Sequence, residues 1–290
     1  MKTNPLSFIK LGSLALSLIL ATSNTAIAQA PAHYDGAVLL LNQIIECQDA
    51  GIFTDANNVS LNRYGGSWSS KTDPSFIRWA DPVNNILPMN NTKCSSLITH
   101  LFKNLYAWNW KNYVFFDPVK NSNQSTVSPE AYQYVQLIKQ AKGFTQIPTL
   151  NNAQTGDILA WWEVGLSSGD HTMIIASIDW NNAKPYPLGY ANSNPALAGT
   201  TYYEVTVVDC SSSTHTADTR LVEVNGQITQ ISGIGSGIVG LLVNQNFEII
   251  GRTWSLPTSD YFTQTNTWVG SLNNRLKLAP TWEIVVGRKQ

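Results

Sequence analysis

The sequence predicts an α+β fold, in which amino-terminal helices pack on an antiparallel β-sheet. In parts of the first half, apolar residues recur every three or four positions, which is typical of amphipathic helices. The second half instead contains short apolar runs separated by turn residues, which is typical of strands. Helical segments that precede the strands, rather than alternating with them, favour α+β over a parallel α/β sheet.

The first residues have the pattern of a secretory signal peptide. Two lysines flank the start of an apolar run at residues 11–21, and the small-residue sequence Ala26-Ile27-Ala28 follows. We expect cleavage after Ala28, because cleavage after Ala30 would leave proline at the first mature position. The mature chain is expected to be secreted or periplasmic, without a membrane span, and to form one domain over residues 29–290 with a β-rich carboxy-terminal extension.

Composition limits the possible partners. Only 13% of the residues are charged and the formal net charge is -1, so the chain has no basic patch of the kind that binds nucleic acid. Ten tryptophans and many Asn, Ser and Thr residues suit a surface that holds peptides or sugars, although most tryptophans of a globular protein lie in its core.

The first helix is predicted over residues 35–47, with Asp35 as its N-cap. Residues 51–91 contain several Gly and Asp-Pro breaks and are expected to form a long ordered loop, with a helical turn near Trp79. Aromatic residues there and on a later strand either line a substrate groove or fix the loop: Tyr64, Trp68, Trp79 and Trp161.

Cys94 is predicted to open the second helix. The apolar positions that follow it fall on one face, at Leu97, Ile98, Leu101, Phe102 and Leu105. Unpaired N–H groups and the positive end of the helix dipole would favour a thiolate there. His100 is turned away from Cys94, so a base for a nucleophilic thiol must come from elsewhere. The alternative is a small buried apolar cysteine.

A third helix is expected over residues 129–142, capped by Ser128, and a turn at residues 151–156 precedes the strands. Strands are predicted at residues 157–162, 171–179, 202–209, 238–243, 247–254 and 282–287.

His171 and Asp209 are predicted to meet across two of these strands. Residues 163–170 form a hairpin-like connection to the strand that His171 begins, and Asp209 ends the next strand. Antiparallel pairing would set the two residues opposite each other, with Cβ atoms ~5 Å apart. An aspartate so placed can hold the histidine tautomer that a nucleophile requires. Taken singly, each could instead be a structural histidine and a turn aspartate.

Three cysteines leave at least one free thiol in an oxidising compartment. A disulfide between Cys47 and Cys210 would leave Cys94 free. His215 and Asp218 follow Asp209 and either line the site or lie in a solvated loop, the reading we favour. No zinc-type motif and no phosphate loop occurs in the sequence, so no metal or cofactor is expected.

Three segments resemble the NlpC-type papain-like cysteine peptidases and amidases. They are Cys-Ser-Ser-Leu-Ile from Cys94, Gly-Asp-Ile-Leu-Ala-Trp from Gly156, and Asp-His-Thr-Met-Ile-Ile from Asp170. The resemblance implies a papain-like fold, Cys94 as nucleophile and His171 as general base. The family's histidine-orienting residue lies on the following strand, which matches Asp209. Lys93 and Ser96 replace the acidic residue and the glycine usual around the cysteine.

These observations predict a secreted, cofactor-independent cysteine hydrolase that cleaves an amide bond, most naturally in a peptidoglycan stem peptide. The Cys94 N–H would form half of an oxyanion hole. One alternative is a non-catalytic cell-wall or glycan-binding protein on a papain-like scaffold. Another is an acyltransferase that uses the same Cys/His pair.

Overall fold

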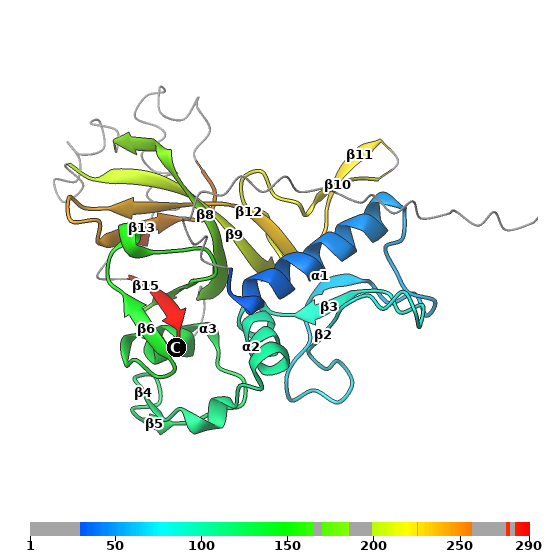
Figure 1. Ribbon diagram of the computed structural model, residues 1–290, viewed down its shortest axis with the longest axis horizontal. Helices are drawn as coiled ribbons and strands as arrows, with labels where there is room; N and C mark the ends of the chain where they lie inside the picture. Colours follow the sequence, from blue (N-terminus) through cyan, green and yellow to red (C-terminus); the bar gives the residue numbers. More distant parts are fainter. Residues whose placement is uncertain (1–29, 165–169, 186–198, 225, 257–276, 279–281) are drawn as a thin grey trace, which may run out of the picture.

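The computed structural model describes residues 30–164, 170–185, 199–224, 226–256, 277–278 and 282–290. The predicted signal peptide and most of the connection after Glu163 lie outside these residues. Within them, the chain is mostly antiparallel β-sheet with few helices, as the predicted α+β class requires (Figure 1). The helices are α1 (Ala32–Asp49), α2 (Cys94–Tyr106) and α3 (Ala131–Lys139), with single 3₁₀ turns at Trp110–Asn112 and Leu150–Asn152.

The main sheet has eight strands among the described residues, and every neighbouring pair is antiparallel. The spatial order is β14 (Lys277–Leu278), β13 (Ile249–Thr253), β12 (Gly233–Val243), β9 (Thr201–Ser211), β8 (His171–Pro185), β7 (Ile158–Glu163), β15 (Trp282–Lys289) and β6 (Phe144–Ile147). Strands β12, β13 and β15 therefore belong to the same sheet as β7, β8 and β9.

Three small sheets complete the β structure. One contains β1 (Asn62–Tyr64), β3 (Met89–Thr92) and β2 (Phe76–Arg78), with β3 in the centre. The other two are hairpins, β4 (Phe115–Asp117) with β5 (Ser122–Gln124) and β10 (Leu221–Val224) with β11 (Gln227–Gln230).

The two faces of the main sheet carry two separate hydrophobic clusters, because successive side chains of a strand point to opposite faces. Ile158, Ala160 and Trp162 of β7 belong to the cluster under the helices, and Leu159 and Trp161 belong to the other. On the second face the sheet is curved, so that strands far apart in the spatial order approach each other. The Arg252 guanidinium of β13 lies 4.2 Å from the Trp161 ring and 4.4 Å from the Trp282 ring, so β13 reaches across to β7 and β15.

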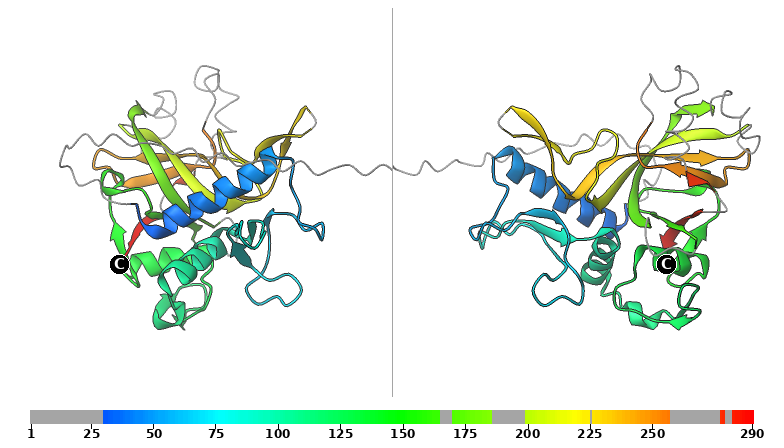
Figure 2. Two further views of the ribbon diagram at one scale, coloured as in Figure 1. Left: turned by 45° about the vertical axis from the view of Figure 1, so that its right-hand side comes forward. Right: turned by 180° about the vertical axis from the view of Figure 1, so that it is seen from behind.

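Helices α1 and α2 cover one side of this sheet and lie against each other (Figure 2). Their close approach depends on Gly36, where a Cβ atom would lie 2.7 Å from Leu105 Cδ1. The apolar face predicted for α2 is buried, since Leu97, Ile98 and Leu101 have no exposed surface. This packing fixes the position of the amino-terminal end of α2, where Cys94 lies.

Both predicted helix caps were wrong. Helix α1 begins at Ala32 after Pro31, which has φ of -62°, and Asp35 lies inside the first turn. Pro31 is the N-cap: its backbone is extended, and its carbonyl oxygen accepts hydrogen bonds from the Tyr34 and Asp35 N–H groups. At α3 the N-cap is Glu130 rather than Ser128, and Gln133 Oε1 accepts a hydrogen bond from the Glu130 N–H at 3.0 Å.

Residues 51–91 are more regular than predicted, since β1, β2 and most of β3 lie within them. The predicted helical turn near Trp79 is absent, and residues 79–80 have no regular structure. Strands of three or four residues with Asn and Arg side chains give too short a pattern for sequence periodicity to detect.

No helix among the described residues combines the length and the apolar character that a membrane crossing would need.

Candidate active site

Cys94 is the first residue of α2, as predicted. Strand β3 leads directly into the helix, and Lys93 between them has extended backbone angles. The Lys93 N–H donates to Ser96 Oγ at 2.8 Å, so Ser96 helps to begin the helix. Cys94 is 7% exposed. The thiol therefore lies at the positive end of the helix dipole, largely shielded from water.

His171 and Asp209 come together, with His171 Nε2 2.6 Å from Asp209 Oδ2. The predicted register was wrong by two residues. Ile174 pairs with Val208, so continuing the ladder places Asp209 across from Met173, and His171 is its diagonal neighbour on the same face. Diagonal neighbours lie farther apart than opposite ones, but an imidazole is long enough to bridge the difference.

His171 also interacts with Cys94. Burial alone would lower the pKa of His171, but the charge of Cys94 and hydrogen bonds to Asp209 and Cys94 raise it to about 9. Because Asp209 occupies Nε2, Nδ1 is the ring nitrogen left for the thiol. The cysteine, the histidine and the aspartate predicted from the sequence are therefore neighbours in space.

Asp209 is completely buried and has three cationic or potentially cationic neighbours. Besides His171, His215 Nε2 lies 3.1 Å from Oδ2 and an Arg220 nitrogen lies 3.0 Å from Oδ1. Burial favours the neutral acid, but the hydrogen bonds from His171 and His215 hold the pKa of Asp209 far below its usual range. The carboxyl group is therefore ionised at neutral pH.

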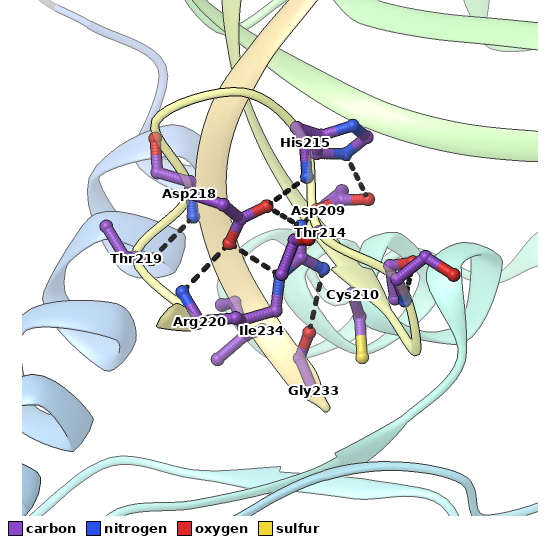
Figure 3. Close-up of polar contacts among 12 residues, drawn as sticks. Asp209, Cys210, Thr214, His215, Asp218, Thr219, Arg220, Gly233 and Ile234 are labelled. Atoms are coloured by element: carbon purple, nitrogen blue, oxygen red, sulfur yellow. Dashed lines mark hydrogen bonds and ion pairs between the residues drawn. The ribbon is translucent and has the colours of Figure 1, made fainter. Parts of the chain in front are cut away.

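His215 and Asp218 are buried, so the interpretation of these residues as part of a solvated loop is wrong. Figure 3 shows both on the loop that follows β9, with Asp218 beside Arg220. The Asp218 carboxylate accepts from the Arg220 guanidinium at 2.8 Å and 2.6 Å. Sequence analysis missed Arg220 altogether. The only available signal was the spacing of Asp218 and Arg220, which is too common in loops to be informative.

His171, Asp209 and His215 are also residue types that bind metals, and their ligand atoms lie within 4.8 Å of one another. Two ring nitrogens, however, converge on the same oxygen at 2.6 Å and 3.1 Å, which is hydrogen-bonding geometry. Ligand atoms around one zinc ion, each ~2.0–2.1 Å from it in a tetrahedron, would lie at least ~3.3 Å apart, farther than either distance here. We therefore interpret the cluster as a hydrogen-bonded network.

A groove of about 330 Å³ lies beside the amino-terminal end of α2. Its lining includes Trp68, Lys93 and Ser95, and continues to Ser128 and Glu130 before α3. Cys94 itself is not part of the lining. The groove is thus an open surface, part polar and part apolar, next to a buried thiol.

The four aromatic residues predicted to line a groove have different positions. Trp68 lines it, with its ring 4.7 Å from that of His100. Tyr64 is partly buried near the thiols, where burial and the charges of Cys94 and Cys210 raise the pKa of its hydroxyl. Trp79 donates to Gly36 O at 2.8 Å, and Trp161 is fully buried behind His171. Trp79 and Trp161 therefore serve packing.

The disulfide considered between Cys47 and Cys210 does not form, and all three cysteines are free thiols. Cys210 is fully buried, and its thiol donates to Thr92 O at 2.9 Å. Burial raises the pKa of Cys210 to about 12. Cys210 is therefore unreactive and packs β9 against β3, the strand that leads to Cys94.

His100 is turned away from Cys94, as predicted. Its Nε2 lies 3.1 Å from Ser75 Oγ, and burial lowers its pKa to about 4. His100 is therefore a buried histidine on the same helix as Cys94 that lies apart from Cys94, His171 and Asp209.

Over 187 residues the chain is 28% identical to an uncharacterized protein of Acanthamoeba polyphaga mimivirus, a match that covers 62% of this chain and 75% of the viral protein. No protein-family model matches the sequence, and no solved structure matches it. The similarity carries no activity from the viral protein to this chain.

Proposed function

We propose that this protein is a secreted cysteine hydrolase on a papain-like scaffold, which cleaves an amide bond in a peptide or a peptidoglycan stem peptide. One observation carries the proposal: at the start of a helix, a thiol lies close enough to a buried histidine to raise its pKa, and a buried, ionised aspartate holds one ring nitrogen of that histidine. This is the arrangement of nucleophile, base and orienting residue that acyl transfer uses.

In the proposed reaction, the Cys94 thiolate attacks the amide carbonyl and His171 transfers its proton to the leaving amine. Water then hydrolyses the thioester, with His171 accepting a proton from it. Asp209 stabilises the imidazolium and keeps Nδ1 directed at the sulfur. The Cys94 N–H, which has no partner within the helix, would donate to the developing oxyanion.

The groove beside α2 suits a peptide. Trp68 offers an apolar surface, and the hydroxyl and charged side chains around it offer hydrogen bonds to a polar backbone. Because Cys94 does not line the groove and is 7% exposed, a substrate must enter by displacing side chains above the thiol.

The test is hydrolysis of muropeptides and of unstructured peptides, followed by mass spectrometry of the products, by the wild type and by Cys94→Ser. We expect cleavage by the wild type and a loss of at least ~10³-fold in the variant, because serine at this site would lack an activated thiolate. The matched control is Cys210→Ser, a buried cysteine that contacts Thr92 instead. Equal cleavage by the wild type and Cys94→Ser would refute the proposal.

A second candidate is a non-catalytic glycan- or wall-binding protein, and the burial of Cys94 favours it, because a binding protein needs no accessible thiol. In that case the groove around Trp68 is the functional surface. Trp68→Ala would abolish binding to purified cell wall, and no change in Cys94 would affect it. The acyltransferase alternative is decided by adding an acceptor amine to the same assay and measuring transfer against hydrolysis.

A further inference from the structure

The loop of residues 212–220, between β9 and β10, places the His215 and Arg220 side chains beside Asp209 (Figure 3). His215 and Arg220 are 4% and 0% exposed. Trp254, which directly follows β13, closes over the loop: its indole donates to Thr214 O at 2.9 Å, and its ring lies 4.1 Å from the His215 ring. His215 is thus held in a fixed orientation without access to water.

The partners of the His215 ring determine where its hydrogens are. Nδ1 lies 2.8 Å from the carbonyl oxygen of Trp254, and Nε2 lies 3.1 Å from Asp209 Oδ2. A carbonyl oxygen only accepts hydrogen bonds, and an ionised carboxylate also only accepts them. Both nitrogens therefore need a hydrogen, since a bare nitrogen would place a lone pair against an acceptor.

Charge balance leads to the same protonation state. Asp209 and Asp218 carry two negative charges in this buried region, and Arg220 supplies one positive charge. A cationic His215 makes these four residues neutral. Cys94 and His171 add no net charge, whether as thiol and imidazole or as thiolate and imidazolium. With a neutral His215 the region would keep one uncompensated negative charge, which is costly in a low-dielectric interior. The Trp254 ring over His215 also favours a cation.

We propose that His215 is an imidazolium that shares one oxygen of Asp209 with His171, and that it acts as a positioning residue setting the pH range in which His171 is protonated. The effect on His171 rests on the proposed Cys94/His171 chemistry, whereas the protonation of His215 does not depend on it. A positive charge on the same carboxylate opposes a second proton on His171 and therefore keeps that proton transferable. The other ionisable groups that face these two histidines are Cys94, Tyr64, Asp170, Cys210, Asp218 and Arg220.

The first test measures the ring nitrogens directly by ¹⁵N NMR of the wild type with labelled histidine, the His215 signals being assigned by their absence from His215→Gln. We expect both nitrogens of His215 to be protonated at pH 7. An unprotonated nitrogen in His215 would overturn the proposal. This readout does not depend on hydrolysis, so a protein without activity could still have the cationic His215, and an active one could lack it.

The second test uses His215→Gln, whose amide can donate to Asp209 but carries no charge. Removing the positive charge favours the protonated form of His171, so its titration, followed by NMR and by the pH profile of Cys94 alkylation, should move upward by about one pH unit. The matched control is His33→Gln. His33 is equally buried but contacts Tyr106 and Gly156 O instead, and this change should leave the profile in place. A folded His215→Gln protein with the wild-type profile would overturn the proposal. If the variant fails to fold, the NMR measurement on the wild type decides, with His215 identified as the histidine left after His33, His100 and His171 are assigned through their own substitutions.

Discussion

Thiol reactivity at Cys94 is the most direct check on its pairing with His171. The rise of the His171 pKa from 6.5 to about 9 corresponds to about 3 kcal/mol in favour of the protonated ring. At pH 7 an ordinary cysteine, with a pKa of ~8.5, is only a few per cent thiolate, so a neighbouring imidazolium can increase the reactive fraction by at most ~30-fold. A stabilised thiolate is also a weaker nucleophile, and we expect about tenfold faster alkylation in the wild type than in His171→Ala.

The assay is alkylation by iodoacetamide between pH 5.5 and 10, with the Cys94 peptide quantified by mass spectrometry. The ratio of the two rates should be largest below pH 9 and fall towards one above it, where His171 loses its proton. His100→Ala is the control, because His100 lies on the same helix but contacts Ser75. Equal rates at pH 7 in the wild type and His171→Ala would refute the pairing, and so would an advantage that persists unchanged at pH 10.

Three further predictions concern stability, each measured by urea unfolding. Asp209→Asn removes the buried counter-ion of Arg220 and its neighbours, and the free energy of unfolding should fall by about 3 kcal/mol; a loss below about 1 kcal/mol would contradict this. Burial lowers the pKa of His33 from 6.5 to about 4, so the stability that its neutral form provides is complete above pH 6.5 and is lost as the pH falls through 4. The difference between the wild type and His33→Gln should therefore shrink by up to ~3 kcal/mol between pH 6.5 and pH 4, and a constant difference would show that His33 does not titrate on unfolding. Gly240→Ala would place a Cβ atom 1.8 Å from the Tyr202 hydroxyl oxygen and should cost at least about 2 kcal/mol; an unchanged midpoint would exclude this overlap.

The elements that sequence periodicity could predict are those that bury one face. Helix α2 begins at the residue expected, and its apolar stripe is buried. Strands β7, β8 and β9 lie where apolar runs predict them. The short strands between residues 51 and 91 were missed because they carry polar side chains such as Asn90 and Asn91, which give no hydrophobic pattern.

The candidate site was predictable in its members but less so in its geometry. Cys94, His171 and Asp209 could be identified because each is of a residue type that catalysis uses and each lies at an end of a predicted helix or strand. The exact pairing of His171 with Asp209 depended on the strand register, which the sequence does not determine to within two residues here. The surroundings of His215 could not be predicted, because the loop that carries it packs against β12 and against Trp254. Loops have no periodicity from which such contacts can be predicted.

The position of β15 has a consequence for how the molecule folds. This strand comes last in the described chain, yet it lies between β7 and β6, which are joined by only a short segment. Until residues 282–289 are available, β7 and β6 have no common partner, and the strand that leads towards His171 has an unpaired edge. Contacts so distant in sequence form slowly, because the intervening chain must be ordered first. We therefore expect His171 and its neighbours Cys94 and Asp209 to assemble late in folding, and a chain still in synthesis to lack a formed site.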